Sequence, residues 1–434
     1  MAALPAHRRL RAGRALLAVV LASSLCVAAC GKHTGRELQP GSYRAVLELP
    51  GGRSLPFGLD VALEEAGPVL YLINGVERVR VTEVVAQPGK LSARMPGYES
   101  TLTATIAGGE LSGAVTLVHA DGRTLELPFE ARLGETWRFH AEPLSDNADL
   151  AGRWDVAFTG GKDERVRAVA EFEQRFEQVT GTVILPADDQ RYLAGEVRDE
   201  ELRLSRFDGG AAVLYQAKLD AAGRLVGEAW TDRGGLQRFV ATRNADADVD
   251  AHAVATRLRN PEAGFEFSAR DLDGRTVSSI DPPFQGKVLL VTLAGSWCPN
   301  SHDEARLLAQ LDRRYRARGL VVVSLMFEQH AEFERAVAAV RRFRAANGIE
   351  YPTLVAGRMD KGLASAALPQ LDAVRAYPTA LFVDRSGRAR KIHTGFAGPA
   401  TRVRHELLVQ EFEQTIEQLL AEPIPGDAAS PESS

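Results

Sequence analysis

The chain has 434 residues, enough for two to four domains of ordinary size at roughly 100–200 residues each. Its composition, with 45% hydrophobic and 25% charged residues, is that of a globular protein. It excludes collagen-like, mucin-like and wholly disordered chains. The formal net charge of −5 argues against a protein that binds nucleic acid by electrostatic attraction.

The N-terminal segment has the layout of a secretory signal. Four arginines, ending with Arg14, precede an apolar run from residue 15 to residue 29 that is too short to span a bilayer. The run ends in Val27-Ala28-Ala29-Cys30-Gly31, which resembles the bacterial lipobox. The resemblance implies that residues 1–29 are a signal peptide and that Cys30 is acylated at its sulfur. Residues 30–40 would then be a lipidated N-terminus and linker.

The lipobox resemblance also implies a location. A lipoprotein of this kind is anchored in the membrane by its lipid and faces the periplasm. In the proteobacterial sorting rule, Gly31 in place of Asp after the cysteine favours the outer membrane. The alternatives are a soluble exported protein cut near Ala29 and an uncleaved anchor.

The chain contains three cysteines. Cys26 leaves with the signal and Cys30 carries the lipid, so Cys298 is the single free thiol expected in the mature chain. No intrachain disulfide is then expected. Because exported proteins commonly carry structural disulfides, a solitary thiol in such a protein should be examined for reactivity.

Residues 41–244 predict an all-β region, because short alternating strands are separated by turn signals such as Asn74-Gly75. The region also repeats at offsets of 110 to 114 residues: Gly41-Ser42-Tyr43-Arg44 aligns with Gly152-Arg153-Trp154-Asp155, Gly109–Gly113 with Gly223–Gly227, and Phe129-Glu130-Ala131 with Phe239-Val240-Ala241. We therefore predict two β repeats, at residues 41–142 and 146–244, each the size of a small antiparallel sandwich or barrel. The pattern leaves open whether they close separately or as one larger sheet. Their expected role is a binding or spacer module that holds the next domain away from a membrane.

The pattern changes after a polar linker at residues 245–262. Apolar runs at residues 287–293 and 320–325 are typical of strands buried on both faces. Periodic apolar residues predict three helices, which carry Leu308, Leu311 and Tyr315; Phe333, Val337 and Val340; and Leu408, Phe412, Ile416 and Leu419. Alternating strands and helices predict an α/β domain at residues 263–423, followed by a disordered tail at residues 424–434.

Cys298 lies between the first of these strands and the first helix, in the segment Gly295-Ser296-Trp297-Cys298-Pro299-Asn300-Ser301-His302-Asp303-Glu304. A thiol at a helix N-terminus meets unpaired backbone N–H groups and the positive end of the helix dipole, and both stabilise the thiolate. Such sites reach pKa values of roughly 3.5–7.5, against about 8.5 for a free thiol. Pro299 suits the first helical turn, and Ser301 can offer its hydroxyl and its backbone N–H to the sulfur.

The Trp-Cys-Pro-Asn-x-His-Asp-Glu pattern after a buried strand resembles the thioredoxin fold. It is most similar to the TlpA/ResA-like periplasmic thiol-disulfide oxidoreductases of the redoxin superfamily, whose motif is Trp-Cys-x-x-Cys. Tyr377-Pro378-Thr379, before the apolar segment 380–383, resembles the cis-proline loop of that family. The resemblance covers about residues 265–420. The whole chain is therefore expected to be multidomain, with two tandem all-β units followed by an α/β thioredoxin-like domain.

The resemblance implies a role for each matching residue. Cys298 would be the nucleophile and Trp297 an apolar shield beside it. Glu304 would tune the thiol, and Pro378 would dock the substrate backbone. One departure is serious, because Ser301 stands where the family has its second cysteine. That cysteine resolves the mixed disulfide in the dithiol mechanism, and serine cannot perform the attack.

We therefore expect a monothiol site in which Cys298 forms mixed disulfides and Ser301, with the adjacent amides, stabilises the thiolate. The expected partner is a thiol- or disulfide-containing protein or a small thiol. No cofactor, metal ion or nucleic acid is expected.

Two other interpretations remain open. One is a redox-inactive thioredoxin-fold scaffold. The other is a one-cysteine peroxidase, in which a peroxide oxidises Cys298 to sulfenic acid. Peroxiredoxins carry Thr or Ser three residues before the reactive cysteine, and Gly295 in that place counts against the peroxidase. His302 is expected either to modulate the thiol or to be exposed to solvent.

Overall fold

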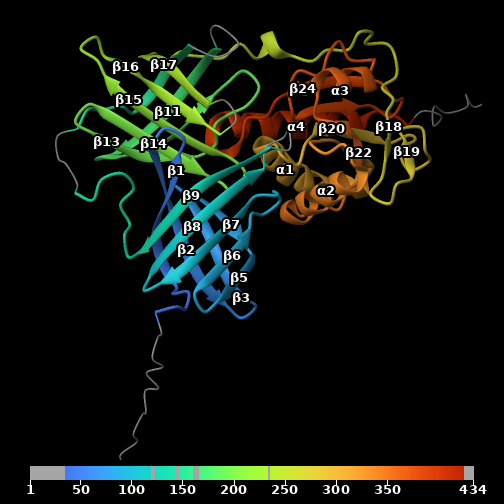
Figure 1. Ribbon diagram of the computed structural model, residues 1–434. Coiled ribbons are helices and arrows are strands. Elements are labelled where there is room, and N and C mark those ends of the chain that lie inside the picture. Colours follow the sequence, from blue (N-terminus) through green and yellow to red (C-terminus); the bar gives the residue numbers. More distant parts are fainter. Residues whose placement is uncertain (1–34, 119–122, 143–146, 160–165, 233–234, 425–434) are drawn as a thin grey trace, which may run out of the picture. The chain divides into compact units, whose positions relative to one another are not determined.

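The computed structural model describes residues 35–118, 123–142, 147–159, 166–232 and 235–424 (Figure 1). The expected signal peptide, the lipidation site at Cys30 and all but the first residue of the expected tail lie outside these residues. The described residues belong to one compact unit. None of their helices is long and apolar enough to cross a membrane.

The first β unit is an antiparallel sheet with the strand order β4-β3-β2-β1-β9-β8-β7-β6-β5. Its strands are β1 (Gly41–Leu49), β2 (Arg53–Glu64), β3 (Gly67–Asn74), β4 (Glu77–Val81), β5 (Glu83–Gln87), β6 (Lys90–Arg94), β7 (Thr101–Ala107), β8 (Glu110–Val118) and β9 (Thr124–Leu133). The two edge strands, β4 and β5, are separated in the chain by Thr82 alone, so the backbone itself joins the two edges. Buried and exposed residues alternate along β7, as expected for a sheet with one apolar face.

The second β unit is a closed barrel in which each strand pairs with its neighbours in the chain and the last pairs with the first. Its strands are β10 (Gly152–Thr159), β11 (Val166–Arg175), β12 (Gln178–Ile184), β13 (Leu193–Arg198), β14 (Glu201–Phe207), β15 (Ala212–Leu219), β16 (Arg224–Thr231) and β17 (Gly235–Arg243). The repeated motifs fall at equivalent places, since they lie at β1 and β10, at β8 and β16, and at β9 and β17. The expectation of two all-β units is confirmed, and they form two sheets instead of one larger sheet.

The two β units share an apolar interface. The core of the first unit includes Phe207 and Trp230 from the second, and the rings of Phe57 and Phe207 have centroids 5.0 Å apart. Buried Asn74 crosses the interface, because its side chain donates to the Phe207 carbonyl at 2.9 Å and accepts from the Phe207 N–H at 3.1 Å.

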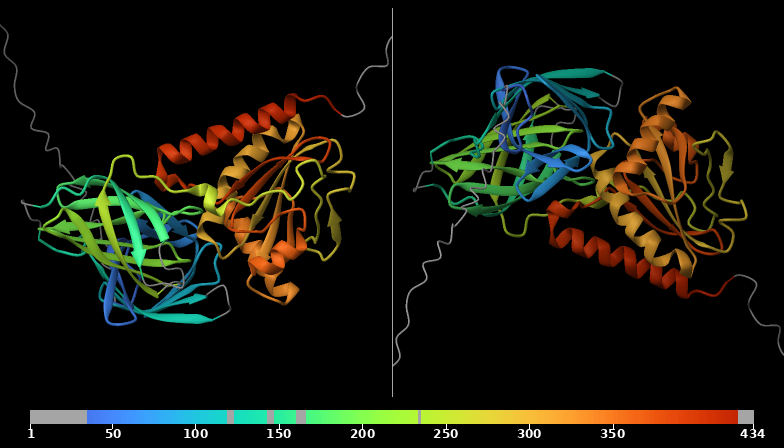
Figure 2. Two further views of the ribbon diagram at one scale, coloured as in Figure 1. Left: turned by 90° about the horizontal axis from the view of Figure 1, so that it is seen from above. Right: turned by 90° about the horizontal axis from the view of Figure 1, so that it is seen from below.

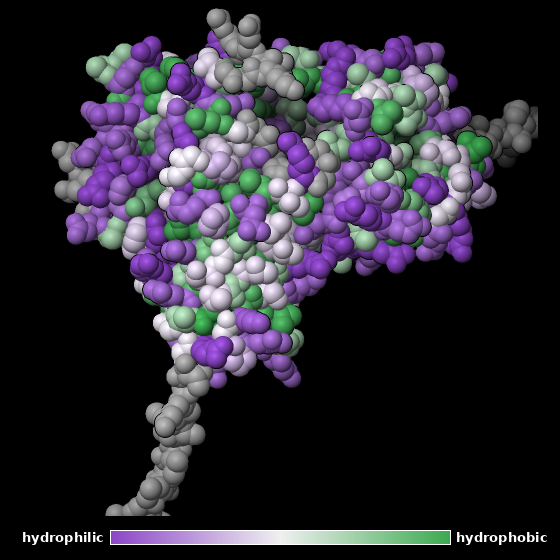
Figure 3. All heavy atoms as spheres, in the orientation of Figure 1, coloured by the Kyte–Doolittle hydropathy of each residue, from purple (hydrophilic) through white to green (hydrophobic). Residues whose placement is uncertain are grey.

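On the face drawn in Figure 3, hydrophilic side chains predominate, with apolar residues scattered among them.

The C-terminal unit is a thioredoxin-like α/β fold with the sheet order β19-β18-β22-β21-β20-β23-β24. Its elements are β18 (Ser268–Arg270), β19 (Thr276–Ser278), β20 (Val288–Ala294), α1 (Pro299–Tyr315), β21 (Leu320–Glu328), α2 (Phe333–Asn347), β22 (Thr353–Arg358), α3 (Lys361–Ala367), β23 (Thr379–Val383), β24 (Ala389–Thr394) and α4 (Val403–Ala421). Strands β20, β21 and β22 are parallel, and the other pairings are antiparallel. The three helices predicted from periodicity correspond to α1, α2 and α4.

Both faces of this sheet are covered (Figure 2). Val288, Leu290 and Ala294 of β20 pack with α1, α2 and α4 on one face. Leu289, Val291 and Leu293 pack with α3 residues and the 265–284 segment on the other. Because β20 and β21 are parallel, the segments that follow them leave the same edge of the sheet. That edge carries Cys298.

Two glycines test the equivalence of the repeats. A Cβ at Gly113 of β8 would lie 2.0 Å from the Thr103 carbonyl oxygen, and a Cβ at Gly227 of β16 would lie 2.2 Å from the Gln216 carbonyl oxygen. Either alanine variant must displace the backbone of a neighbouring strand. We expect each to lower the free energy of unfolding by about 2 kcal/mol or more in chemical denaturation. Gly264→Ala is the control, because its Cβ would meet its nearest atom at 3.7 Å. Equal stability of all three variants would contradict this expectation.

Candidate thiol site

Cys298 occupies the N-terminal boundary of α1. Its backbone is extended, with φ −97° and ψ 118°, and Pro299 is the first helical residue. The Cys298 N–H donates to the Gly295 carbonyl at 3.1 Å, and the His302 N–H donates to the Cys298 carbonyl at 3.3 Å. The chain therefore leaves buried β20, turns tightly and begins the helix at the cysteine.

The Cys298 sulfur lies beside the loop that contains Pro378. Cys298 Sγ donates to the Tyr377 carbonyl at 3.4 Å, and the Tyr377–Pro378 peptide bond is cis. Trp297 Nε1 donates to the Phe327 carbonyl at 2.9 Å, and the Trp297 ring packs edge-on against Tyr377 with centroids 5.7 Å apart. Trp297, Cys298 and Pro378, which sequence reasoning placed in one site, are thus brought together.

The thiol is largely covered by protein atoms. Cys298 is 7% exposed, and Pro299 and Pro378 are also buried. Trp297 is half-buried and is the most accessible of the six residues expected in the catalytic site.

Ser301 is fully buried, at 0% exposure. Its hydroxyl oxygen accepts a hydrogen bond of 3.4 Å from the Gly295 N–H, at the point where β20 ends. This contact ties the first turn of α1 back to the strand. The expected role of Ser301 toward the thiolate stays a prediction.

Glu304 lies on the first part of α1 and is buried. Its Oε2 accepts a hydrogen bond from Thr292 Oγ1 at 2.5 Å, and its Oε1 has no hydrogen-bond partner among the described residues. Burial raises the pKa of Glu304 to about 8, so the group carries a proton at neutral pH. Glu304 can therefore hold a proton inside the α/β unit, and it carries little negative charge there.

Glu328 was missed by sequence reasoning. It ends β21 and is fully buried, and it accepts two hydrogen bonds from Ser296, from the N–H at 3.0 Å and from the hydroxyl at 2.6 Å. Burial raises its pKa to about 7. One sequence signal could have found it. Glu328 ends a long apolar run, and a carboxylate at the end of a buried strand has little water around it and needs a protein partner. Glu328 fixes the turn two residues before Cys298.

His302 is not exposed to solvent, so that part of the expectation was wrong. It is 3% exposed, and its ring packs against Tyr98 and Phe343 with centroids 4.5 and 4.6 Å apart. Asn347 Nδ2 donates to His302 Nδ1 at 2.8 Å, so the proton resides on Nε2, which donates to the Ser296 carbonyl at 2.9 Å. Burial lowers the pKa of His302 to about 4, and the ring is neutral. His302 thus binds the Ser296 carbonyl, whereas Glu328 binds the N–H and the hydroxyl of the same residue.

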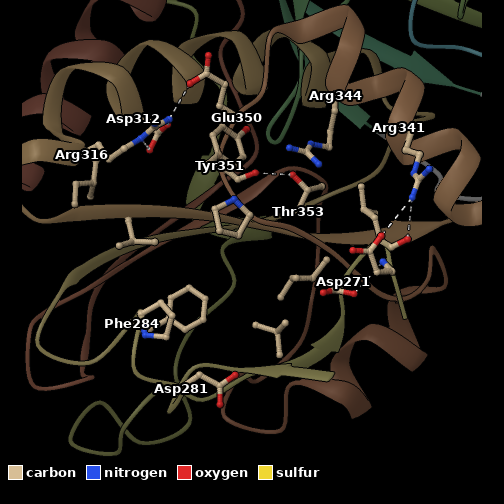
Figure 4. A pocket seen from close by; sticks show the side chains of 18 residues that line it. Asp271, Asp281, Phe284, Asp312, Arg316, Arg341, Arg344, Glu350, Tyr351 and Thr353 are labelled. Carbon is tan, nitrogen blue, oxygen red and sulfur yellow. Dashed lines mark hydrogen bonds and ion pairs between the residues drawn. The ribbon is translucent and has the colours of Figure 1, made fainter. Parts of the chain in front are cut away.

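A cavity of about 770 Å³ lies elsewhere in the α/β unit (Figure 4). It is lined by the first residues of β21 and β22, Leu320 and Thr353, whereas Cys298 follows the last residues of β20. Because these strands are parallel, the cavity and the thiol are at opposite edges of the sheet. In the described part of the chain, no group of three or more His, Cys, Asp or Glu residues could hold a metal ion.

Residues 262–392 match the AhpC/TSA family, so the match lies within the α/β unit and does not extend to the β units. No curated protein matches the sequence. Among solved structures, the chain is similar to a thioredoxin-family thiol:disulfide interchange protein from Chlorobium tepidum, with 21% identity, a TM-score of 0.29, and coverage of 37% of this chain and 98% of the other.

Two further solved structures are similar. One is a secreted disulfide oxidoreductase from Mycobacterium tuberculosis, with 18% identity, a TM-score of 0.26, and coverage of 35% of this chain and 96% of the other. The other is a secreted thiol-disulfide isomerase from Corynebacterium glutamicum, with 15% identity, a TM-score of 0.30, and coverage of 42% and 97%. The family match lies in the α/β unit and includes both Cys298 and Pro378.

The raised pKa of Glu304 predicts a pH-dependent stability. Below pH 4.5 the group is protonated in both the native and the unfolded chain. Between pH 4.5 and about 8 the unfolded chain loses the proton while the native protein retains it, so native stability falls. Glu304→Gln has no proton to lose. We expect the unfolding free energy of the wild type to fall by several kcal/mol relative to this variant between pH 5 and pH 9, at about 1.4 kcal/mol per pKa unit.

Chemical denaturation at both pH values measures this difference. Glu65→Gln, at an exposed position, is the matched control and should follow the wild type. Parallel stability curves for wild type and Glu304→Gln would show that Glu304 is ionised in the native protein.

Proposed function

We propose that this protein is a monothiol thiol-disulfide oxidoreductase of the cell envelope, related to the TlpA/ResA type. The observation that carries the proposal is the position of Cys298 at the start of α1, with its sulfur 3.4 Å from the carbonyl of Tyr377 beside Pro378. The first turn of α1 offers unpaired N–H groups and the positive end of the helix dipole, which stabilise a thiolate at this place.

The first reaction step is a thiol-disulfide exchange. The Cys298 thiolate attacks one sulfur of a substrate disulfide, R–S–S–R′. A bond forms between Cys298 Sγ and the sulfur of R, the substrate S–S bond breaks, and R′–S⁻ leaves with the electron pair. The Tyr377 carbonyl contacts the sulfur, and the next residue, Pro378, would align the substrate backbone during this attack.

The second step needs a thiol from outside the chain. Ser301 stands where a resolving cysteine would be, and an alcohol does not open a disulfide under these conditions. A small thiol or a partner-protein thiol, as R″–S⁻, attacks the mixed disulfide, forms R–S–S–R″ and releases the Cys298 thiolate. The net reaction exchanges one disulfide for another, and the enzyme returns to its starting state without a bound cofactor.

The proposed location rests on the N-terminal sequence. The arginines before residue 15, the apolar run and the Ala-Ala-Cys-Gly ending support export and acylation of Cys30. The thiol site would then face the periplasm on a lipid-anchored protein. A disulfide-forming compartment supplies the disulfide substrate that the first step requires.

One observation favours a second candidate function. Cys298 and Pro378 are both buried, and a redox-inactive scaffold has no need for an accessible thiol. The one-cysteine peroxidase is the third possibility. In that function a peroxide, and not a disulfide, would oxidise Cys298.

Alkylation of Cys298 as a function of pH separates these functions. We expect half-maximal labelling below pH 7 or so, because a helix N-terminus lowers the pH at which a thiolate forms, and a stable mixed disulfide after treatment with oxidised glutathione. Mass spectrometry measures both, and Cys298→Ser is the control. Labelling with a midpoint near pH 8.5 would support the scaffold. Rapid consumption of hydrogen peroxide with trapped sulfenic acid would support the peroxidase.

Restoring the second cysteine provides a separate test. Without any added thiol, the wild type should stop at the mixed disulfide with a reducible protein such as insulin, whereas Ser301→Cys should release the substrate thiol, because the new thiol can resolve the mixed disulfide. Ser301→Ala is the matched control and should also stop at the mixed disulfide, which mass spectrometry detects. If Ser301→Cys retains the mixed disulfide as well, the geometry around α1 does not support the dithiol mechanism.

A further inference from the structure

The second β unit reaches the thiol site through one loop. Residues 185–192, between β12 and β13, carry Asp189 and Arg191, which are both buried. Their partners lie in the first turns of α1, directly after Cys298. Sequence reasoning gave the β units the role of a spacer, and these contacts assign them a place in the site itself.

Asp189 joins two segments of the α/β unit. Its Oδ2 accepts hydrogen bonds from Asn300 Nδ2 at 3.1 Å and from the Gly398 N–H at 2.7 Å. Its Oδ1 accepts from the Arg191 N–H at 2.7 Å. Asn300 is the residue before Ser301 in the motif and also donates to the Phe396 carbonyl at 3.3 Å. Asp189 therefore connects the motif helix to the segment that follows β24.

Arg191 binds the same helix through an ion pair with Asp303. Its guanidinium faces Asp303 with Nη2 3.1 Å from Oδ1 and Nε 3.0 Å from Oδ2. The same guanidinium pairs with Glu77 at 2.7 Å and with Asp208 at 2.8 Å. Arg191 is 5% exposed, so these pairs are held away from bulk water. Arg206 also pairs with Asp208, and Arg306 pairs with Asp303.

The first β unit adds a second contact at the same edge of the sheet. Glu99 accepts from Arg342 at 2.9 Å and pairs with His330 at 2.5 Å, and His330 lies two residues after Glu328. Both β units therefore contact the segments around the thiol.

We propose that Asp189 and Arg191 are positioning residues for the Cys298 site: by fixing Asn300 and Asp303, they hold the first turns of α1 in the place where its N–H groups stabilise the thiolate. This inference rests on the proposed function. Its physical basis is that the stabilisation of an anion by N–H groups and by a helix dipole falls off within the first turn, so a small displacement of that turn weakens it.

The test compares two arginines of the same buried cluster. Arg191→Met removes the contacts to Asp303, whereas Arg206→Met removes a buried cation that pairs with Asp208 and, among the described residues, forms no hydrogen bond or ion pair with α1. Each variant loses one buried pair with Asp208. We expect Arg191→Met to raise the pH of half-maximal Cys298 alkylation by about 0.5 to 1 unit, and Arg206→Met to leave it unchanged.

Thermal unfolding of each full-length variant accompanies the labelling, and Arg191→Lys should restore part of the shift because it retains the charge. Should Arg191→Met fail to fold, Asp189→Asn and Asp303→Asn probe the same contacts from both sides and should raise the labelling midpoint. Equal midpoints for the wild type and the variants that contact α1 would overturn the inference. A wild-type midpoint near 8.5 would instead overturn the proposed function, so the two failures are distinguishable.

Discussion

The structure around the thiol depends on one constraint, the tight turn from buried β20 into α1. Ser296 in that turn is buried, and a buried polar group needs a hydrogen-bond partner. Ser296 obtains its partners from Glu328 on β21 and from His302 on α1. Both partners belong to regular elements of the core, so they hold the turn in one position. The position of Cys298 against Tyr377 follows from this fixed turn, since only Trp297 lies between Ser296 and Cys298 in the chain.

Three buried carboxyl groups lie near this turn, and burial is the main cause of the raised pKa of each. Burial raises the pKa of Glu304 to about 8, and those of Glu328 and Asp189 to about 7. A charged carboxylate costs more than a neutral one where water is excluded. The negative charge of the neighbouring Asp303 raises the pKa of Asp189 further. Each group binds its proton more tightly in the native protein, so each makes native stability fall as the pH rises from about 4 toward neutrality. The proton content of the site therefore changes in the pH range where thiolates form.

Local sequence patterns were sufficient for part of this architecture. The 3.6-residue period placed Leu308, Leu311 and Tyr315 on one buried face of α1, and the junction of an apolar run with that helix located Cys298. Short recurring motifs located the two β units. Helix α3 was missed, because its seven residues span only two turns and bury Ala364 alone. The environment of His302 was also missed, since Tyr98 lies about two hundred positions earlier in the chain and no local period reports such a neighbour. Glu328 was missed because its partner, Ser296, lies in the loop after a different strand, β20.

The contacts of Arg191 show why the β units could not be assigned from sequence. Arg191 and Asp303 are 112 positions apart, and an arginine followed by a strand looks like any solvated loop residue. Burying an ion pair gives little net stability, because the cost of removing two charges from water offsets most of their attraction. Breaking one side of such a pair is costly, since it leaves the other charge buried without compensation. A cluster of this kind therefore adds less to overall stability than to the choice of one arrangement over its alternatives. In this chain the arrangement it selects is the one that sets α1, and with it the sulfur of Cys298, against the loop of Pro378.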